Sequence, residues 1–215
     1  MFESKTGVLF IGGVGFFALA FLGNVVVPIF MYRDMPEKTV EQLIQPRIRA
    51  QFVDLATRYS EPFEKAFGEP TDENLAKALR LGRQVYVGEG CWHCHSQFVR
   101  PVSNESKRYG EVARTSEYQN ELQRPVLFGT RRVGPDLSRE GGRHGNDWHA
   151  VHFFKPKLVQ SDSPMPEYPW FFEGSPDKPT RRGLALMTYI QWLGSWHETY
   201  PYYEELSDLK KEEAQ

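Results

Sequence analysis

The stretch CWHCH at residues 91–95 holds both cysteines of the chain, Cys91 and Cys94, and ends on His95. The spacing C-x-x-C-H is the attachment pattern of a c-type haem. Two thiols on one turn reach the two vinyl groups of the porphyrin, and the adjacent histidine is then held beneath the iron as its proximal ligand. The motif therefore predicts one haem c, attached covalently through Cys91 and Cys94, with His95 as an axial ligand.

A redox-active cysteine pair, a zinc site and a chance match fit the chain less well than a haem. A thioredoxin-like redox pair is expected beside a βαβ pattern, which the flanking sequence lacks. A zinc site normally takes four Cys or His ligands, and the chain contains no second cysteine pair. A chance match would not explain why both cysteines lie inside the motif. Two cysteines this close together also exclude a disulfide-stapled secreted scaffold, which needs several bridges along the chain.

The second axial ligand of the iron is expected to be a methionine or a histidine from elsewhere in the chain. Met165 lies between Pro164 and Pro166, in a stiff segment that can present its thioether to the haem. Met187 falls inside a periodic helical segment, where a packed core methionine is the ordinary outcome. The remaining methionines lie in or beside the apolar N-terminal stretch. The sequence therefore favours Met165 as the distal ligand.

Three histidines, His144, His149 and His152, compete with Met165 for this position. The last two are three residues apart in a short helix that we expect to begin near Asn146, so each could reach inward. A surface or hydrogen-bonded histidine is nonetheless the more common outcome. His/Met ligation also suits the potential of an electron-transfer haem.

The string GPDL at residues 134–137 and several arginines are candidates for haem support. A ligating histidine usually donates its second N–H to a carbonyl, and Pro135 would supply a rigid one; the alternative is an ordinary turn. Arg131, Arg132 and Arg143 flank glycine-rich loops and would pair with the haem propionates through their forked donors. For each arginine, a solvated surface position is at least as common an outcome.

Residues 7–32 contain no charged side chain. As a helix this stretch would be about 39 Å long, enough to cross a hydrocarbon core of ~30 Å with some tilt. A cleaved signal peptide has a shorter apolar region, of about 7–15 residues, followed by an A-x-A-like site that is absent here. The sequence therefore predicts a single retained transmembrane anchor.

One face of the predicted anchor carries three small residues, Gly12, Gly15 and Gly23, which would let another helix approach closely. Asn24 lies elsewhere on the helix and needs a polar partner in the hydrocarbon. Both features indicate a neighbouring membrane subunit, although glycine is also simply common in membrane helices. The charges on the two sides of the anchor are nearly balanced and orient it poorly.

After the anchor the chain is polar, and overall it has 25% charged residues, a mean hydropathy of −0.53 and a net charge of −2. This composition excludes a polytopic membrane protein. It also argues against nucleic acid as a partner, because that needs a clustered positive excess. A length of 215 residues fits one domain of ordinary size together with its anchor.

The predicted organisation has five parts: a cytoplasmic N-terminus, an anchor, a neck with a short helix, a haem domain and a charged tail, at residues 1–6, 7–32, 33–70, 71–203 and 204–215. The neck helix is expected at residues 47–59, where Ile48, Phe52 and Leu55 share one face. The haem domain is expected to begin with a helix capped by Thr71 and to end with a helix over residues 180–196.

The C-x-x-C-H motif, the GPDL string and Met165 together resemble a class I cytochrome c, a mainly α-helical fold. Gly82 matches the first-helix glycine that lets the first and last helices of that fold cross closely. More narrowly, the chain resembles the monohaem, N-terminally anchored cytochrome c subunit of cbb(3)-type cytochrome oxidases, the CcoO/FixO family. The strings that carry this resemblance are GCWHCHSQFVRP, RYG, RRVGPDLSREGGRHGNDWHAVHF and MPEYPW, at residues 90–101, 108–110, 131–153 and 165–170.

Two features depart from the pattern of this family. The neck, through residues 45–70, is longer than usual, which leaves its packing and its partner undefined. Pro164 stands where the family often has an aliphatic residue. Met165, the ligand itself, still matches.

The resemblance implies an electron-transfer subunit without catalytic residues of its own. Haem c, held outside the cytoplasmic membrane, would accept electrons from another c-type cytochrome and pass them to haem b of a catalytic haem-copper subunit that reduces oxygen. Because covalent haem attachment occurs on the periplasmic side, the N-terminus would stay in the cytoplasm. Three alternatives are the anchored cytochrome c subunit of nitric oxide reductase, a haem-based sensor with an open sixth position, and a freestanding tethered carrier.

Overall fold

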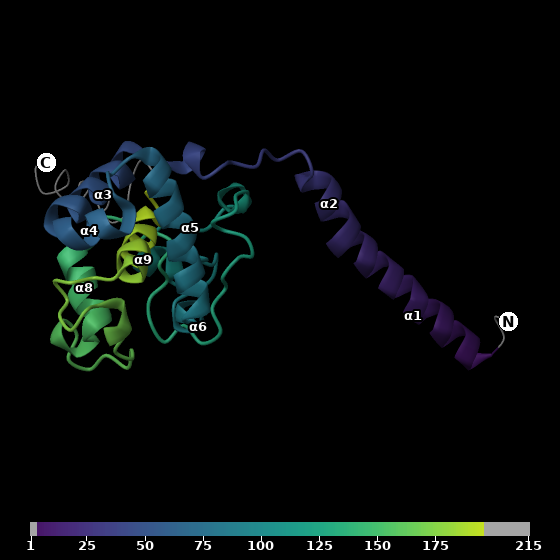
Figure 1. Cartoon of the computed structure of the whole chain (residues 1–215). Helices are drawn as coiled ribbons and strands as arrows, with labels where there is room; N and C mark the ends of the chain where they lie inside the picture. Colours follow the sequence, from purple (N-terminus) through teal and green to yellow (C-terminus); the bar gives the residue numbers. More distant parts are fainter. Residues whose placement is uncertain (1–3, 196–215) are drawn as a thin grey trace, which may run out of the picture. The chain divides into compact units, whose positions relative to one another are not determined.

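The computed structural model in Figure 1 describes residues 4–195 of the chain. Within that range the chain forms helices joined by loops, and its only β-structure is two isolated bridges. The predicted mainly α-helical class is therefore confirmed. The chain separates into two compact units, Met1–Glu37 and Lys38–Gln215.

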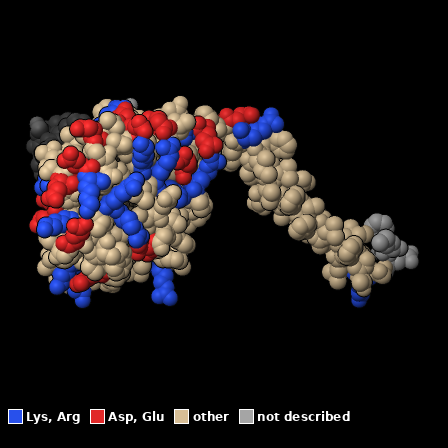
Figure 2. All heavy atoms as spheres, viewed as in Figure 1, with Lys and Arg blue, Asp and Glu red and all other residues tan. Residues whose placement is uncertain are grey.

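The first unit is one apolar helix of 28 residues, Lys5–Tyr32. It consists of α1 (Lys5–Phe21), a π-helical turn (Leu22–Val26) and α2 (Val27–Tyr32). Between its ends it carries no charged side chain, as Figure 2 shows. Its length and composition fit a single-pass membrane anchor.

Asn24 lies in the π-helical turn, and Pro28 follows it in the first turn of α2. Pro28 has no N–H and cannot bond to the carbonyl four residues back, and beside it the N–H of Val27 bonds to the carbonyl of Leu22, five residues back. The side-chain amide of Asn24 donates to the Ala20 carbonyl at 3.0 Å. Asn24, which was expected to need a polar partner, therefore meets part of that need within its own helix.

The second unit is built around two helices that pack side by side, α5 (Asp72–Gly88) and α9 (Arg181–Trp192) (Figure 1). They approach most closely at Gly82, where an added Cβ would lie 2.1 Å from the carbonyl oxygen of Ala185. Interiors are too densely packed to absorb such an overlap, so any side chain here would push the helices apart. The expected close crossing at Gly82 is confirmed.

Both helices begin at a threonine whose hydroxyl accepts the backbone N–H three residues on, at 3.3 Å for Thr71 and 3.4 Å for Thr180. This bond satisfies one of the free donors of the first turn. The cap at Thr71 lies where the sequence predicts it, and Thr180 is the residue at which the last helical segment was expected to begin. The last helix ends at Trp192, while residue 196 and the predicted charged tail, residues 204–215, lie outside the described residues.

The segment expected to be a neck packs into the core of the second unit. It contains η2 (Glu41–Leu43), α3 (Pro46–Arg58) and α4 (Ser60–Phe67), and both α-helices pack against α9. The predicted apolar face of α3 is buried. The residues of this segment that enter the core are Val40, Leu43, Ile44, Ile48, Phe52, Leu55, Tyr59, Phe63 and Phe67.

The chain between α5 and α9 forms short helices and loops around the site. The short helices are α6 (Cys91–Cys94), α7 (Glu105–Tyr109), η3 (Thr115–Tyr118), α8 (Asn146–Phe154), η4 (Pro156–Leu158) and η5 (Pro169–Phe171). Buried ion pairs tie the loops together. Arg139 contacts Glu117 at 2.6 Å with both side chains at most 7% exposed, and Arg132 contacts Glu105. These pairs connect loop segments that are distant in the sequence and that no local sequence pattern links.

Candidate haem site

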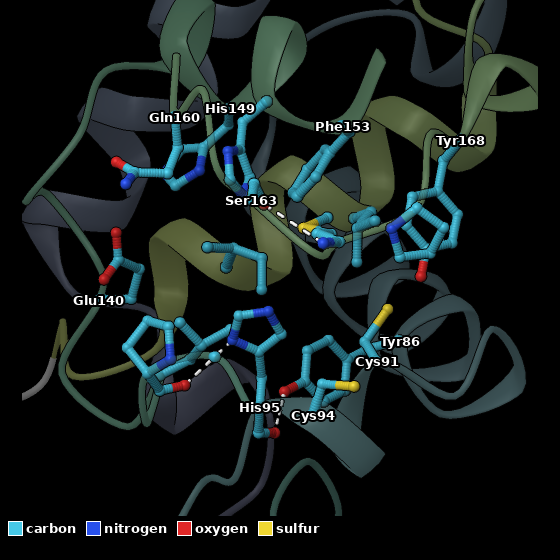
Figure 3. A pocket seen from close by; sticks show the side chains of 18 of the residues that line it. Tyr86, Cys91, Cys94, His95, Glu140, His149, Phe153, Gln160, Ser163 and Tyr168 are labelled. Atoms are coloured by element: carbon cyan, nitrogen blue, oxygen red, sulfur yellow. Dashed lines mark hydrogen bonds between the residues drawn. The ribbon is translucent and has the colours of Figure 1, made fainter. Parts of the chain in front are cut away.

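The two cysteines lie on α6, which follows α5 through a sharp turn. Gly90 makes this turn with φ +71°, a left-handed conformation that costs glycine little. Both thiols are free and line one cavity of about 420 Å³ (Figure 3). Burial raises the pKa of the Cys91 thiol to about 12, so this group is a neutral S–H at neutral pH. The fold thus brings both predicted attachment thiols to the same cavity.

His95 lines the same cavity, and three neighbours fix its position. Its Nδ1 donates to the Pro135 carbonyl at 3.0 Å, which leaves the lone pair of Nε2 free. The Tyr86 hydroxyl donates to the His95 carbonyl at 2.7 Å. Gly134 lies so close that an added Cβ would be 2.2 Å from Cε1 of the ring. Burial lowers the pKa of His95, which favours the neutral imidazole that a metal ligand must be.

Met165 lines the cavity from the proline-braced segment Ser163-Pro164-Met165-Pro166. Its backbone N–H donates to Oγ of Ser163 at 3.2 Å. Figure 3 shows Ser163 and His95 on facing sides of the cavity. Met187 is fully buried in the core and is not among the lining residues. Of these two methionines, only Met165 therefore shares the cavity with His95.

The cavity has the size and chemistry that a haem requires. Its walls are largely apolar, with side chains from α5, α8, α9 and the loops between them, such as Leu137, Phe153, Phe171, Leu186 and Ile190. Cofactor sites are typically concave and apolar, with a few well-placed polar groups and about 300–1,000 Å³ of space. Free thiols beside a histidine and a methionine are the donor set of a c-type haem. The residues present fit the group.

Comparison with known families gives an independent result. The family model described as "Cytochrome C oxidase, mono-heme subunit/FixO" matches residues 74–214. The chain belongs to the FixO family. It is therefore a mono-haem subunit of cytochrome c oxidase, which implies a membrane complex with other oxidase subunits, and the resemblance drawn from the sequence is confirmed. The anchor, α3 and α4 precede the matched residues. No curated protein matches the chain.

In this FixO chain the arginines offered as propionate partners do not line the cavity. The guanidinium of Arg132 contacts Glu105 and lies 3.7 Å from the carboxylate of Asp136. Arg143 has a side chain that is 37% exposed and lies 3.8 Å from Glu140. Arg132 and Arg143 thus face carboxylates of the chain itself, and Arg131 is likewise not among the lining residues.

Glu140, Trp148 and Gln160 are among the lining residues that the sequence analysis did not identify. His144 Nδ1 lies 2.5 Å from Oε1 of Glu140. The Trp148 ring stacks between His144, at 3.8 Å, and His152, at 4.5 Å. For Trp148 and His152 the signal is present in the sequence, because residues four apart lie on the same face of a helix, whereas His144 precedes α8.

Proposed function

We propose that this FixO chain carries electrons through one covalently bound haem c within a cbb(3)-type terminal oxidase. It accepts electrons from a c-type cytochrome and passes them to the catalytic haem-copper subunit, which reduces oxygen. The observation that supports this best is one cavity lined by the Cys91 and Cys94 thiols, His95 and Met165, in a chain of the mono-haem oxidase family.

Cys91 and Cys94 would hold the haem by thioether bonds. In each bond a thiol S–H adds across a vinyl C=C: sulfur bonds to one carbon and hydrogen to the other, so no oxidant is consumed. His95 and Met165 would occupy the two axial positions. When bound, haem c supplies a one-electron Fe(III)/Fe(II) couple.

The chain's own residues hold the ligands in place and keep water away. The hydrogen bond to the Pro135 carbonyl keeps the proton of His95 on Nδ1. This bond orients the ring and makes Nε2 a stronger metal ligand. Leu186 and Ile190 of α9 line the cavity with apolar side chains. With His95 and Met165 both bound to it, the iron would have no position left for oxygen. The chain therefore relays electrons and leaves oxygen reduction to its partner.

The proposed location is the cytoplasmic membrane, with the haem domain in the periplasm. Because haem c is attached on the periplasmic side, residues 1–6 would be cytoplasmic and residues 71–203 periplasmic, with the apolar helix crossing once. Around Gly12, Gly15 and Gly23 the structure leaves open space on this helix. A helix of the catalytic subunit would approach at this face.

The test is to purify the full chain from membranes with its partners and to measure three properties. We expect one haem that survives the alkaline pyridine assay as haem c, a ferrous haem c absorption that carbon monoxide does not change, and a partner that contains haem b and copper. Non-haem iron in place of copper would indicate nitric oxide reductase. Carbon monoxide binding at this haem would indicate a sensor, and purification without any partner would indicate a freestanding carrier.

A further inference from the structure

A buried carboxylate adjoins the carbonyl that holds the His95 ring. Asp136 follows Pro135, and the Pro135 carbonyl accepts the hydrogen bond from Nδ1 of His95 at 3.0 Å. The Asp136 side chain has no exposed surface, and the residue is not among those that line the cavity. A carboxylate is costly to bury unless the surrounding chain supplies hydrogen-bond donors. Its donors therefore show which parts of the chain it holds together.

Asp136 accepts hydrogen bonds from two separate segments of the chain. One oxygen, Oδ2, accepts the Ser96 hydroxyl at 2.5 Å and the backbone N–H of Phe98 at 2.8 Å. The other, Oδ1, accepts the backbone N–H of Ser138 at 2.8 Å. Both oxygens of the carboxylate thus serve as acceptors. The donors come from the residues directly after the CWHCH motif and from the turn that contains Asp136 itself.

These bonds fasten the segment of the axial histidine to the segment of its hydrogen-bond acceptor. The two segments are residues 94–98 and 134–138. The backbone N–H groups of Gly134 and Leu137 donate to carbonyls of the first segment at 3.1 and 2.9 Å. Between them Pro135 has no N–H to donate, so the carboxylate of the next residue supplies bonds that the backbone lacks there. The place of the Pro135 carbonyl beside the ring thus depends on this carboxylate.

One buried cation is shared by Asp136 and a second carboxylate. Nη2 of Arg132 lies 3.7 Å from Oδ2 of Asp136, and Nη1 of the same guanidinium contacts Glu105. Glu105 also accepts the backbone N–H of Arg100 at 2.8 Å. These bonds of Glu105 go to residues outside the two paired segments. Neutralising Glu105 therefore changes the same cluster of charges and leaves the bonds between the segments in place.

We propose that Asp136 is a positioning residue for the axial histidine: its carboxylate holds the Pro135 carbonyl against the Nδ1 proton of His95. The inference rests on the proposed function, in which Nε2 of His95 binds the haem iron. A hydrogen bond at Nδ1 raises the basicity of the ligand nitrogen, and a more basic ligand favours ferric over ferrous iron. A loosened Pro135 carbonyl would therefore let the Nδ1 proton exchange with water more readily and would raise the reduction potential.

The test uses the full chain, purified in detergent with its haem, and three variants. Asp136→Asn keeps the shape of the side chain but replaces one acceptor oxygen by an amide donor. Ser96→Ala removes one of the three bonds and no charge, and Glu105→Gln removes a charge and none of the three bonds. The reduction potential is measured, together with the rate at which the His95 Nδ1 proton exchanges with solvent, by NMR of the ferrous chain with isotope-labelled histidine.

We expect the exchange rate to rise about tenfold in Asp136→Asn and about threefold in Ser96→Ala, the range that the net strength of a hydrogen bond allows. The reduction potential should rise in both variants, and in Ser96→Ala it does so without any loss of charge. In Glu105→Gln the exchange rate should stay at the wild-type value, although the lost negative charge also raises the potential.

An unchanged exchange rate in Asp136→Asn, with full covalent haem content, would overturn the inference, as would equal exchange rates in Asp136→Asn and Glu105→Gln. If Asp136→Asn does not accumulate, Ser96→Ala decides the question: a wild-type exchange rate and potential in that variant would refute the assignment. A wild-type chain without covalent haem would instead overturn the proposed function.

Discussion

The two faces of the haem cavity are held in different ways. On one face, the His95 ring is fixed by a hydrogen bond to Pro135 at 3.0 Å and by close contact with Gly134. On the other face, Met165 lies in a segment stiffened by prolines, with one hydrogen bond from its N–H to Ser163 at 3.2 Å. The nitrogen ligand is thus positioned by contacts from distant segments, and the sulfur ligand by the stiffness of its own backbone. Substitutions on the His95 face should therefore have the larger effects.

The largest effect is expected from Gly134→Val. A Cβ at this position would lie 2.2 Å from Cε1 of His95, so the ring must move away from its place. We expect the low-spin haem spectrum to be lost and the yield of folded chain to fall, measured by absorption spectroscopy and haem content. Gly88→Ala is the control, because nothing lies within 4 Å of a Cβ there. A low-spin spectrum retained by Gly134→Val would show that the close contact does not fix the ring.

Met165→Leu should break the opposite face without unfolding the domain. We expect the weak near-infrared sulfur-to-iron band to disappear and the reduction potential to fall, because a thioether stabilises ferrous iron. The matched control is Met187→Leu, which should keep the band and cost less than about 1.5 kcal/mol of stability. If Met187→Leu removes the band while Met165→Leu keeps it, the ligand assignment is wrong.

Arg132→Gln should weaken the support behind the His95 face. Arg132 and Glu105 are only 11% and 12% exposed, so the substitution leaves buried carboxylates without their cation. Breaking a buried pair in this way typically costs about 3–5 kcal/mol. Chemical denaturation of the holo chain measures the loss. Arg143→Gln, at a half-exposed position, should change the free energy of unfolding by less than about 0.5 kcal/mol, and equal losses in both variants would contradict this difference.

The smallest effects compare one hydrogen bond from each face. Tyr86→Phe removes the bond to the His95 carbonyl, and Ser163→Ala removes the acceptor of the Met165 N–H. Each should cost about 0.5–1.5 kcal/mol of stability. Carbon monoxide binding to ferrous haem distinguishes the two variants. It should increase in Ser163→Ala, because the backbone of Met165 loses its hydrogen bond to Ser163. It should stay unchanged in Tyr86→Phe. Equal binding in the two variants would remove the distinction between the faces.

Local patterns predicted a large part of this architecture. The C-x-x-C-H motif, the threonine cap at Thr71, and the apolar face of α3 all depend on residues within a few positions of one another. Such signals are set by short-range geometry, namely the first free N–H groups of a helix and its period of about 3.6 residues. Gly82 was found through the family resemblance, since its contact with α9 is distant in sequence.

Long-range partners could not be predicted in this way. The sequence analysis proposed Arg132 as a partner of the haem propionates, whereas the structure pairs it with Glu105. No local pattern around either residue indicates that contact. The segment before α5 resembled a neck because prolines interrupt it, yet Phe52 and Phe63 pack ring to ring at 4.8 Å within the shared core. Which surface an amphipathic helix covers depends on the whole fold.

The π-helical turn at Leu22–Val26 divides the membrane helix into two halves with different rotational registers. Each residue of a regular α-helix turns by about 100°, and a hydrogen bond that spans five residues in place of four inserts one extra residue at that point. Side chains that share one face of the helix before the turn therefore do not continue on the same face beyond Val26. Gly12 and Gly15 belong to the first half, and Gly23 lies within the turn. The anchor thus presents two short contact surfaces to neighbouring helices, one before the π-helical turn and one after it, and the two point in different directions around the helix axis.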